Sequence, residues 1–455
     1  MKKLFSLMFL LLTAFVLVGC GGDEEPTGEK IMNPDVEPGT IVIWVGTESA
    51  EFYQGVADDY IEQFNADPTK PYLYPHQIEV RAVDGGTAAG VFLDDPASGP
   101  DILTVAHDNL GRLIAGSPAI YPITYEPLLA QIEAYNTVEI QSVIRANSGG
   151  ESFIWGVPYE AQSLVLYYDN SKLTEEDVKT WEGIWAKAKE HDARSVTVTG
   201  LDGYNNSFLV LSSFVETGIM PVEIYRDGIL TNTQLVNDGA ISMMRWGQRF
   251  FSDPNGAGEA SDSGWEVDLA NGATLSIIGG FWNFNAASAA LGENLSITVL
   301  PQYTLTEDDV YGDIEAGTVM QSGTFADAKM FVINKRSAYL FYLEDILLYM
   351  TTKEVQEASF LANSTLPAYK NAFTEFEGMD GTDVRTQLAV SQIAMFQHGI
   401  PQPFGVDARF NFYYYQKQGP EKLFDMLINR NGDYSTVEQI IAQMEVVEAI
   451  WRNNN

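Results

Sequence analysis

Residues 101–109 read Asp-Ile-Leu-Thr-Val-Ala-His-Asp-Asn, an apolar run that stops abruptly at three polar residues. The part up to residue 106 is typical of a strand that is buried on both faces. A second run of this kind, Thr-Ile-Val-Ile-Trp-Val at 40–45, is followed by an apolar stripe over 52–64 that predicts a helix, and by a further predicted strand at 77–83. This alternation is the pattern of an α/β layered lobe with a mostly parallel sheet.

The alternation returns beyond residue 160 with a different composition. The sequence predicts strands at 163–168, 195–199, 274–278, 295–300 and 329–333, and helices at 180–189, 209–215, 241–251 and from a cap at Ser337 to Met350. Residues 302–325 are acidic and are expected to be irregular, and Thr351 with Glu354 fits a capping box for a further helix. Because 455 residues are too many for one ordinary core, we expect two lobes.

Cys20 is the only cysteine of the chain, and it closes a short leader. Lys2 and Lys3 precede an apolar run at 4–18, which has the character of a secretory signal and is shorter than the roughly 18–20 residues that span a bilayer. The ending Leu-Val-Gly-Cys resembles the lipobox of bacterial lipoproteins. That resemblance implies removal of residues 1–19 and a lipid on the Cys20 thiol; the alternative is an uncleaved anchor with an incidental cysteine. Residues 20–39 then form a flexible acidic tether.

The chain is strongly acidic, with a formal net charge of −36. The leader carries two lysines and no acidic residue, so its removal makes the chain more acidic still. Such a surface repels nucleic acid, and we expect no nucleic-acid partner. Since the single cysteine cannot form an internal disulfide, packing alone must hold the exported chain together.

Polar and aromatic residues follow the predicted strands at the point where a solute would bind. In an open parallel sheet, ligands bind at the carboxyl ends of the strands. The residues at those ends are Glu48, Ser49, His107, Asp108, Asn109, Asp202, Tyr204, Asn205, Asn206, Phe281, Trp282 and Asn283. Carboxylates and amides bind vicinal hydroxyls, and an aromatic ring packs against the apolar face of a pyranose, so this mixture favours a sugar. The alternative is that Glu48 and Asp108 only cap helices and that one ring of the Phe281–Trp282 pair belongs to the core.

Signals for an enzyme are poor. The four histidines form no His-Glu-x-x-His pattern and no Cys–His metal spacing, and the sequence has no nucleophile elbow or phosphate-binding glycine loop. We therefore expect a protein that is not an enzyme, without cofactor or metal.

Four segments resemble the extracellular solute-binding proteins that supply ABC importers, closest to their maltose/maltodextrin-binding branch. These segments are the strand at 40–44 followed by Glu48, the stretch at 99–108, the stretch at 156–168, and the stretch at 272–282 together with Ile-Thr-Val-Leu-Pro at 297–301. The resemblance implies a periplasmic-binding-protein-like fold of type II, with two α/β lobes and a ligand cleft between them. It implies one lobe made of 40–160 and 302–352, and a second lobe made of 161–301 and 353–455.

The resemblance carries over only part of the family's sugar contacts. Asp108 falls on a polar contact, but Asn109 stands where an arginine is usual, and Ser49 replaces a lysine. Gln162 takes the place of a glutamate, with Glu160 two residues earlier. Phe281 falls on a stacking tryptophan. The residues expected to bind the substrate are Glu48, Ser49, Asp108, Asn109, Glu160, Gln162, Tyr204, Phe281, Trp282, Phe404 and Phe410.

The resemblance implies a monomeric, lipid-anchored binding component of a carbohydrate importer on the extracellular face of the cytoplasmic membrane. Its expected partners are an oligosaccharide, the permease subunits of an ABC importer, and the membrane through Cys20. Two alternatives remain open at this point. One is an exported carbohydrate-active hydrolase with paired carboxylates. The other is the same fold with a non-sugar solute, such as a polyamine, a metal or a peptide.

Overall fold

The computed structural model describes most of the chain after the predicted leader. The described residues are 30–137, 140–141, 144–199, 203–206, 208–212, 222–223, 232–233, 236–257, 263–370, 372, 383–401, 426–427 and 432–452. Cys20, Phe404 and Phe410 lie outside them. In the part of the chain that is described, every helix is too short or too polar to span a bilayer.

The first half of the chain builds a sheet around strand β1 (Thr40–Val45). β1 pairs in parallel with β2 (Gln77–Ala82) on one side and with β3 (Ile102–Ala106) on the other. The stripe predicted at 52–64 lies on α2 (Ala50–Ala66), which buries Tyr53, Val56 and Tyr60 in the same core as β1. The other elements of this half are η2 (Thr47–Ser49), α3 (Ala88–Asp94), η3 (His107–Asn109), α4 (Leu110–Ile114), β4 (Ile120–Tyr121), α5 (Glu126–Tyr135), β5 (Arg145–Ser148) and β6 (Glu151–Ile154).

A second sheet has the strand order β13-β8-β12-β9. Its strands are β13 (Leu295–Thr298), β8 (Val165–Asp169), β12 (Ser276–Gly279) and β9 (Thr197–Val198). Helices α7 (Trp181–His191) and α10 (Asp238–Ser252) bury Trp181, Trp246 and Phe250 beside it in a second core. The remaining elements here are η4 (Asp177–Lys179), α8 (Gly203–Asn206), β10 (Val222–Glu223), β11 (Asn232–Thr233), α11 (Trp265–Asn271), η5 (Phe281–Asn283), α12 (Phe284–Leu291), η6 (Gly292–Asn294), β14 (Gln302–Thr304) and β15 (Val319–Gln321).

Two long strands connect the two cores. β7 (Val157–Gln162) and β16 (Thr324–Asn334) pair antiparallel, and β16 also pairs antiparallel with β3 and β4. Phe325 at the start of β16 belongs to the second core, whereas Phe331 belongs to the first. Both sheets are therefore mixed rather than mostly parallel. In the first sheet β16 runs antiparallel to β3 and β7, and in the second sheet β8 runs antiparallel to β12 and β13.

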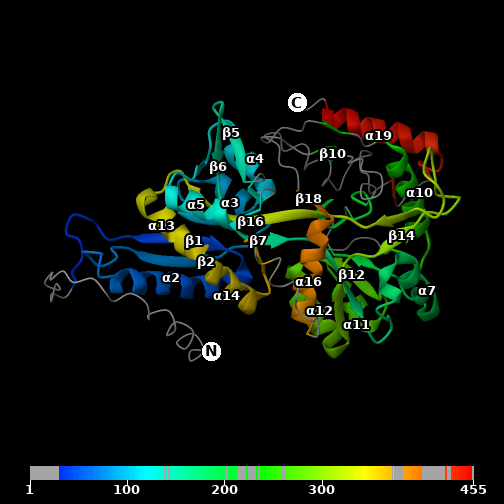
Figure 1. Cartoon of the computed structure of the whole chain (residues 1–455), viewed down its shortest axis with the longest axis horizontal. Helices are drawn as coiled ribbons and strands as arrows, with labels where there is room; N and C mark the ends of the chain where they lie inside the picture. Colours follow the sequence, from blue (N-terminus) through cyan, green and yellow to red (C-terminus); the bar gives the residue numbers. More distant parts are fainter. Residues whose placement is uncertain are drawn as a thin grey trace.

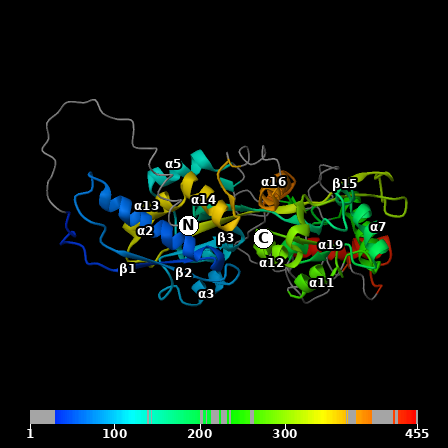
Figure 2. The ribbon, with the colours of Figure 1, turned by 90° about the horizontal axis from the view of Figure 1, so that it is seen from below.

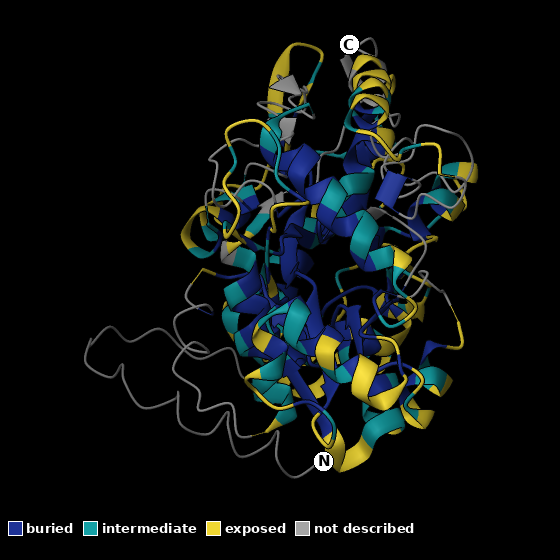
Figure 3. Ribbon diagram, turned by 90° about the vertical axis from the view of Figure 1, so that its right-hand side faces the viewer, coloured by how far each residue is buried: buried dark blue, intermediate teal, exposed yellow. Residues whose placement is uncertain are grey.

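The C-terminal part of the chain is mainly helical. It contains α13 (Leu340–Met350), α14 (Lys353–Asn363), β17 (Leu366–Pro367), α16 (Val384–Gln397), β18 (Gly399–Pro401) and α19 (Val437–Arg452). Figures 1 and 2 show α2 and α13 at one end of the long axis and α7 and α19 at the other, with β16 extending between the two groups. Buried residues fill the interior of both groups, and exposed residues lie on the outer helices and loops (Figure 3).

Several predicted boundaries differ from the structure for local reasons. α13 begins at Leu340 and not directly after Ser337, because the Ser337 hydroxyl accepts from the backbone nitrogen of Tyr339 at 3.0 Å within a turn that precedes the helix, and donates to Asp101 at 2.6 Å. Thr352, not Thr351, caps α14 by accepting from the backbone nitrogen of Val355. Residues 209–212 of the helix predicted at 209–215 form turns. The segment expected to be irregular, 302–325, contains the antiparallel pair β14 and β15.

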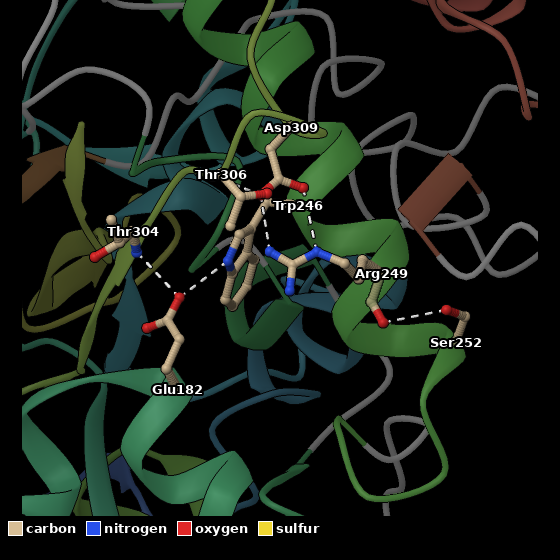
Figure 4. Close-up of polar contacts among 7 residues, drawn as sticks. All are labelled: Glu182, Trp246, Arg249, Ser252, Thr304, Thr306 and Asp309. Atoms are coloured by element: carbon tan, nitrogen blue, oxygen red, sulfur yellow. Dashed lines mark hydrogen bonds and ion pairs between the residues drawn. The ribbon is translucent and has the colours of Figure 1, made fainter. Parts of the chain in front are cut away.

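A buried polar network fixes that pair to the helices behind it (Figure 4). Glu182 on α7 accepts hydrogen bonds from the indole of Trp246 at 3.1 Å and from the backbone nitrogen of Thr304 at 3.0 Å. Arg249 on α10 contacts both carboxylate oxygens of the buried Asp309, at 3.3 and 2.8 Å. The acidic segment 302–325 is therefore held in place by these side-chain contacts as well as by the pairing of β14 with β15.

Candidate functional site

The antiparallel ladder between β7 and β16 places four polar side chains together. Its register sets Asp327 opposite Gln162 and Lys329 opposite Glu160. Directly opposed residues of an antiparallel pair share a face, and residues two apart on a strand share it too. A register shift directly after Lys329 ends this arrangement. The four side chains therefore lie on one face of the segment that connects the two cores.

Lys329 joins groups from three separate elements. Its ammonium lies 3.3 Å from Oε1 of Glu160 and 3.9 Å from Oε1 of Glu48, which lies on η2 after β1. It also lies 4.7 Å from the centroid of the Phe281 ring on η5, after β12. Phe281 belongs to the second core, whereas the strand before Glu48 belongs to the first. One ammonium thus contacts side chains contributed by both halves of the molecule.

Burial and local charge control the protonation of Glu160. Its side chain is 1% exposed, and burial raises the pKa of this carboxyl above its ordinary value. The neighbouring Lys329 ammonium opposes that rise in pKa, whereas the Glu48 carboxylate adds to it. Gln162 donates a hydrogen bond from its amide to Glu160. The ladder therefore holds a buried carboxylate whose charge depends on the lysine opposite it.

Asp108 reaches the same ladder through a histidine. His107 and Asp108 lie on η3, directly after β3, and the buried His107 pairs through Nδ1 with Asp327 on β16. Burial and the charge of Asp327 raise the pKa of Asp108 to about 7, against the lowering effects of His107 and Arg112. The amide of Asn109 donates to Oδ1 of Asp108 at 2.7 Å. Asp108 consequently carries a proton over a wider pH range than an ordinary aspartate.

The two neighbouring aromatic residues on η5 have opposite environments. Trp282 is 40% exposed, whereas Phe281 is 3% exposed and lies edge-on to Trp282 at 5.6 Å between ring centroids. Tyr204 on α8 is buried, with its ring 5.9 Å from Trp282 and stacked on Phe325 of β16 at 6.1 Å. Trp282 is therefore the ring of this group with area left for a ligand.

Most of the described residues predicted for the site gather around the β7–β16 ladder, but Ser49 and Asn109 form structural hydrogen bonds. Ser49 is buried, and its hydroxyl accepts from Asn363 of α14 at 3.5 Å. Asn109 binds within its own turn, to Asp108 and to the carbonyl of Ala106. Phe404 and Phe410 lie outside the described residues, so their place at the site stays a prediction.

Two residues of this cluster, Asp327 and Lys329, were missed by the reasoning from sequence. The predicted strand began only at residue 329, which put Asp327 outside it. A signal was present, however, because Asp327 and Lys329 alternate with alanines just as Glu160 and Gln162 flank Ala161. Charged residues at every second position of an otherwise apolar strand indicate a shared polar face.

An open groove lies away from these residues, between α11 and α12. It has a volume of about 520 Å³ and is lined mainly by small apolar side chains, including Val267, Ala270 and Ala286. None of the predicted site residues lines it. Among the described residues, no group of three or more His, Cys, Asp or Glu side chains is placed to hold a metal ion.

Comparison with protein families gives a match over most of the chain. Residues 59–381 match the model of the bacterial extracellular solute-binding proteins. Among curated proteins, no sequence matches the chain significantly.

Solved structures resemble the whole chain. A maltodextrin-binding protein from L. casei without ligand is 20% identical with a TM-score of 0.69, and the match covers 92% of this chain and 99% of that one. A cyclo/maltodextrin-binding protein complexed with maltotetraose is 16% identical with a TM-score of 0.64, covering 92% and 98%. The maltose-binding periplasmic protein from Listeria monocytogenes in complex with maltose is 15% identical with a TM-score of 0.65, covering 91% and 97%. These likenesses confirm the predicted two-lobe α/β fold.

Proposed function

Since the chain belongs to the bacterial extracellular solute-binding proteins, we propose that it is the binding component of an ABC carbohydrate importer and takes up a maltodextrin-type oligosaccharide between its two halves. The observation that carries the proposal is the meeting of Glu48, Glu160 and Phe281 at Lys329. Carboxylates bind sugar hydroxyls, and the two halves must each supply contacts if the solute is to hold them together.

The proposed contacts divide between stacking and hydrogen bonding. The exposed ring of Trp282 packs against the apolar face of a pyranose. Glu48, Asp108 and Gln162 exchange hydrogen bonds with its hydroxyls, with Asp108 able to donate as well as accept because its pKa is raised to about 7. The ring of Tyr204 packs against that of Trp282, with 5.9 Å between the ring centroids. The binding of maltose and maltotetraose by proteins of similar fold supports this choice of sugar.

Uptake of the solute is coupled to movement of the lobes. We place residues 40–160 in one lobe with β16 and α13, and residues 161–301 in the other. The boundaries expected at 302 and 353 shift, because β14 and β15 pack in the second core, whereas β17 pairs with β7 of the first sheet. The lobes bend about the crossing strands β7 and β16, and the sugar stabilises the closed form through its contacts with both lobes. The closed form then docks on the permease subunits of the importer. A lipid on Cys20 and the tether that follows it keep the protein close to that permease. The tether is shorter than the predicted 20–39, because Lys30 donates to the carbonyl of Asn65 and Met32 pairs with Leu73.

Calorimetric titration of the chain from residue 20, with Cys20→Ser to prevent lipidation, tests the proposal. Maltose, maltotriose and maltotetraose are compared with cellobiose and xylobiose in parallel. We expect saturable binding of at least one α-linked glucan, together with a rise in melting temperature, because a ligand that binds only the native state stabilises it. Absence of binding to every sugar, or release of new reducing ends by the purified protein, would contradict the proposal, and the second outcome would favour a hydrolase.

A further inference from the structure

The surroundings of the Lys329 ammonium have the chemistry of a binding site for a cation. Two carboxylates, from Glu48 and Glu160, lie within 3.9 and 3.3 Å of it, and the ring of Phe281 lies 4.7 Å away. Carboxylates and an aromatic face are the groups that bind an organic ammonium ion from outside a protein. Here the ammonium belongs to the chain itself.

We propose that Lys329 determines specificity by occupying this cation site from within the chain, so that cationic solutes such as polyamines are excluded and neutral sugars are admitted. The proposal rests on the proposed function in one respect, because that function places the solute at the β7–β16 ladder. It goes beyond that function in naming the class of solute that the site rejects and the residue that rejects it.

The net charge of the whole molecule gives a reason for a lysine at this place. A net charge of −36 raises the concentration of cations around the molecule as a whole. Without Lys329, Glu48 and Glu160 would present two neighbouring carboxylates and an aromatic ring to the solute. A lysine attached to the strand competes at a high effective concentration, so a free polyamine must displace it before binding.

The ladder holds Lys329 in position. Its backbone lies opposite Glu160 in the β7–β16 register, and its side chain is 18% exposed. The other carboxylate of this face, Asp327, has its own partner in His107. Lys329 is therefore directed to Glu160 and Glu48.

Titration with spermidine tests the proposal. Three single variants, Lys329→Met, Lys329→Arg and Lys335→Met, are compared with the unaltered mature chain by calorimetry at pH 8. Lys335→Met removes the same charge from the exposed end of β16 and serves as the matched control. The pH lies above neutral because burial raises the pKa of Glu160, and loss of Lys329 removes a group that lowers it.

We expect Lys329→Met to bind spermidine at least tenfold more tightly than the unaltered chain, whereas Lys329→Arg and Lys335→Met do not. Adding Glu160→Gln to Lys329→Met should abolish the gain. Equal spermidine affinity in Lys329→Met and the unaltered chain, with both folded by circular dichroism, would overturn the proposal. Should the Met variant fail to fold, Lys329→Gln, whose amide still donates to Glu160, takes its place with the same expectations.

Maltotriose, titrated into the unaltered chain in the same experiment, separates the two proposals. Failure to bind maltotriose counts against the proposed sugar. A spermidine affinity that does not respond to residue 329 counts against the proposed role of Lys329, whatever the sugar result.

Discussion

Trp282 and Phe281 are neighbours in sequence but differ sharply in exposure, at 40% and 3%. The sequence predicted that one of the two rings belongs to the core, and it could not tell which one. Both follow a buried strand and lie in a single turn of 3₁₀ helix, where a small change in backbone direction exchanges the inward and outward positions. The choice depends on tertiary packing, in which Phe281 contacts Lys329 and Trp282 contacts Tyr204.

Trp282→Ala should weaken sugar binding by about 1–3 kcal/mol, because it removes the exposed stacking surface while leaving the core intact. Calorimetric titration with maltotriose measures the effect. Phe341→Ala is the matched control, since Phe341 is an exposed ring on α13, at the far end of the first half. Equal affinity in Trp282→Ala and the unaltered chain would remove Trp282 from the site.

Asp108 should make the free energy of unfolding depend on pH. The pKa of its carboxyl is raised to about 7 in the folded chain, against roughly 3.9 for an unfolded aspartate. Between these values the native state binds the extra proton, so its stabilising contribution is present at low pH and is lost as pH rises toward 7. Urea unfolding at several pH values should show the free energy of unfolding of the unaltered chain falling relative to Asp108→Asn between about pH 4 and about pH 7. A constant difference between the two proteins would contradict the assignment.

At the scale of elements, the buried strands and the amphipathic helices were predictable, whereas the part of the crossing strand β16 before residue 329 was not. Its first half, from Thr324, pairs with β18, which lies more than 60 residues later in the chain. The local pattern of apolar residues cannot indicate a pairing strand that lies so far away in the sequence. Asp327 and Lys329 also interrupt the apolar run, so the pattern indicated a strand only from residue 329 onward. The site residues missed from the sequence lie in this interrupted part.

Arg249→Met should destabilise the second half of the molecule by about 1–3 kcal/mol, because it leaves the buried Asp309 carboxylate without its counter-ion. Urea unfolding followed by tryptophan fluorescence measures this, and Trp185 lies beside the Arg249 guanidinium. Lys179→Met is the control, since the Lys179–Glu176 pair is 64% and 81% exposed and its loss should leave the free energy of unfolding almost unchanged. Similar effects of the two variants would show that the Asp309 network contributes no more than a surface pair.

At the scale of the whole molecule, the sequence predicted two lobes because the chain is too long for one core and because its pattern of strands restarts after residue 160. Two large hydrophobic cores do form, and Lys329 contacts Phe281 of the second core and Glu48, which follows a strand of the first. The net charge of −36 argued against a nucleic-acid partner, but composition did not select between sugars and polyamines. That distinction depends on one lysine, whose neighbours come from strands and turns that are distant in sequence.

The central claim of the proposal is that sugar recognition takes place at the β7–β16 ladder, with contacts from both halves of the molecule. A crystal structure of the mature chain grown with maltotriose tests this most directly. The account predicts a glucose ring stacked on Trp282, with hydroxyls within hydrogen-bond distance of Glu48 or Asp108. A maltotriose bound elsewhere on the surface, with Trp282, Glu48 and Asp108 all free of it, would contradict the account.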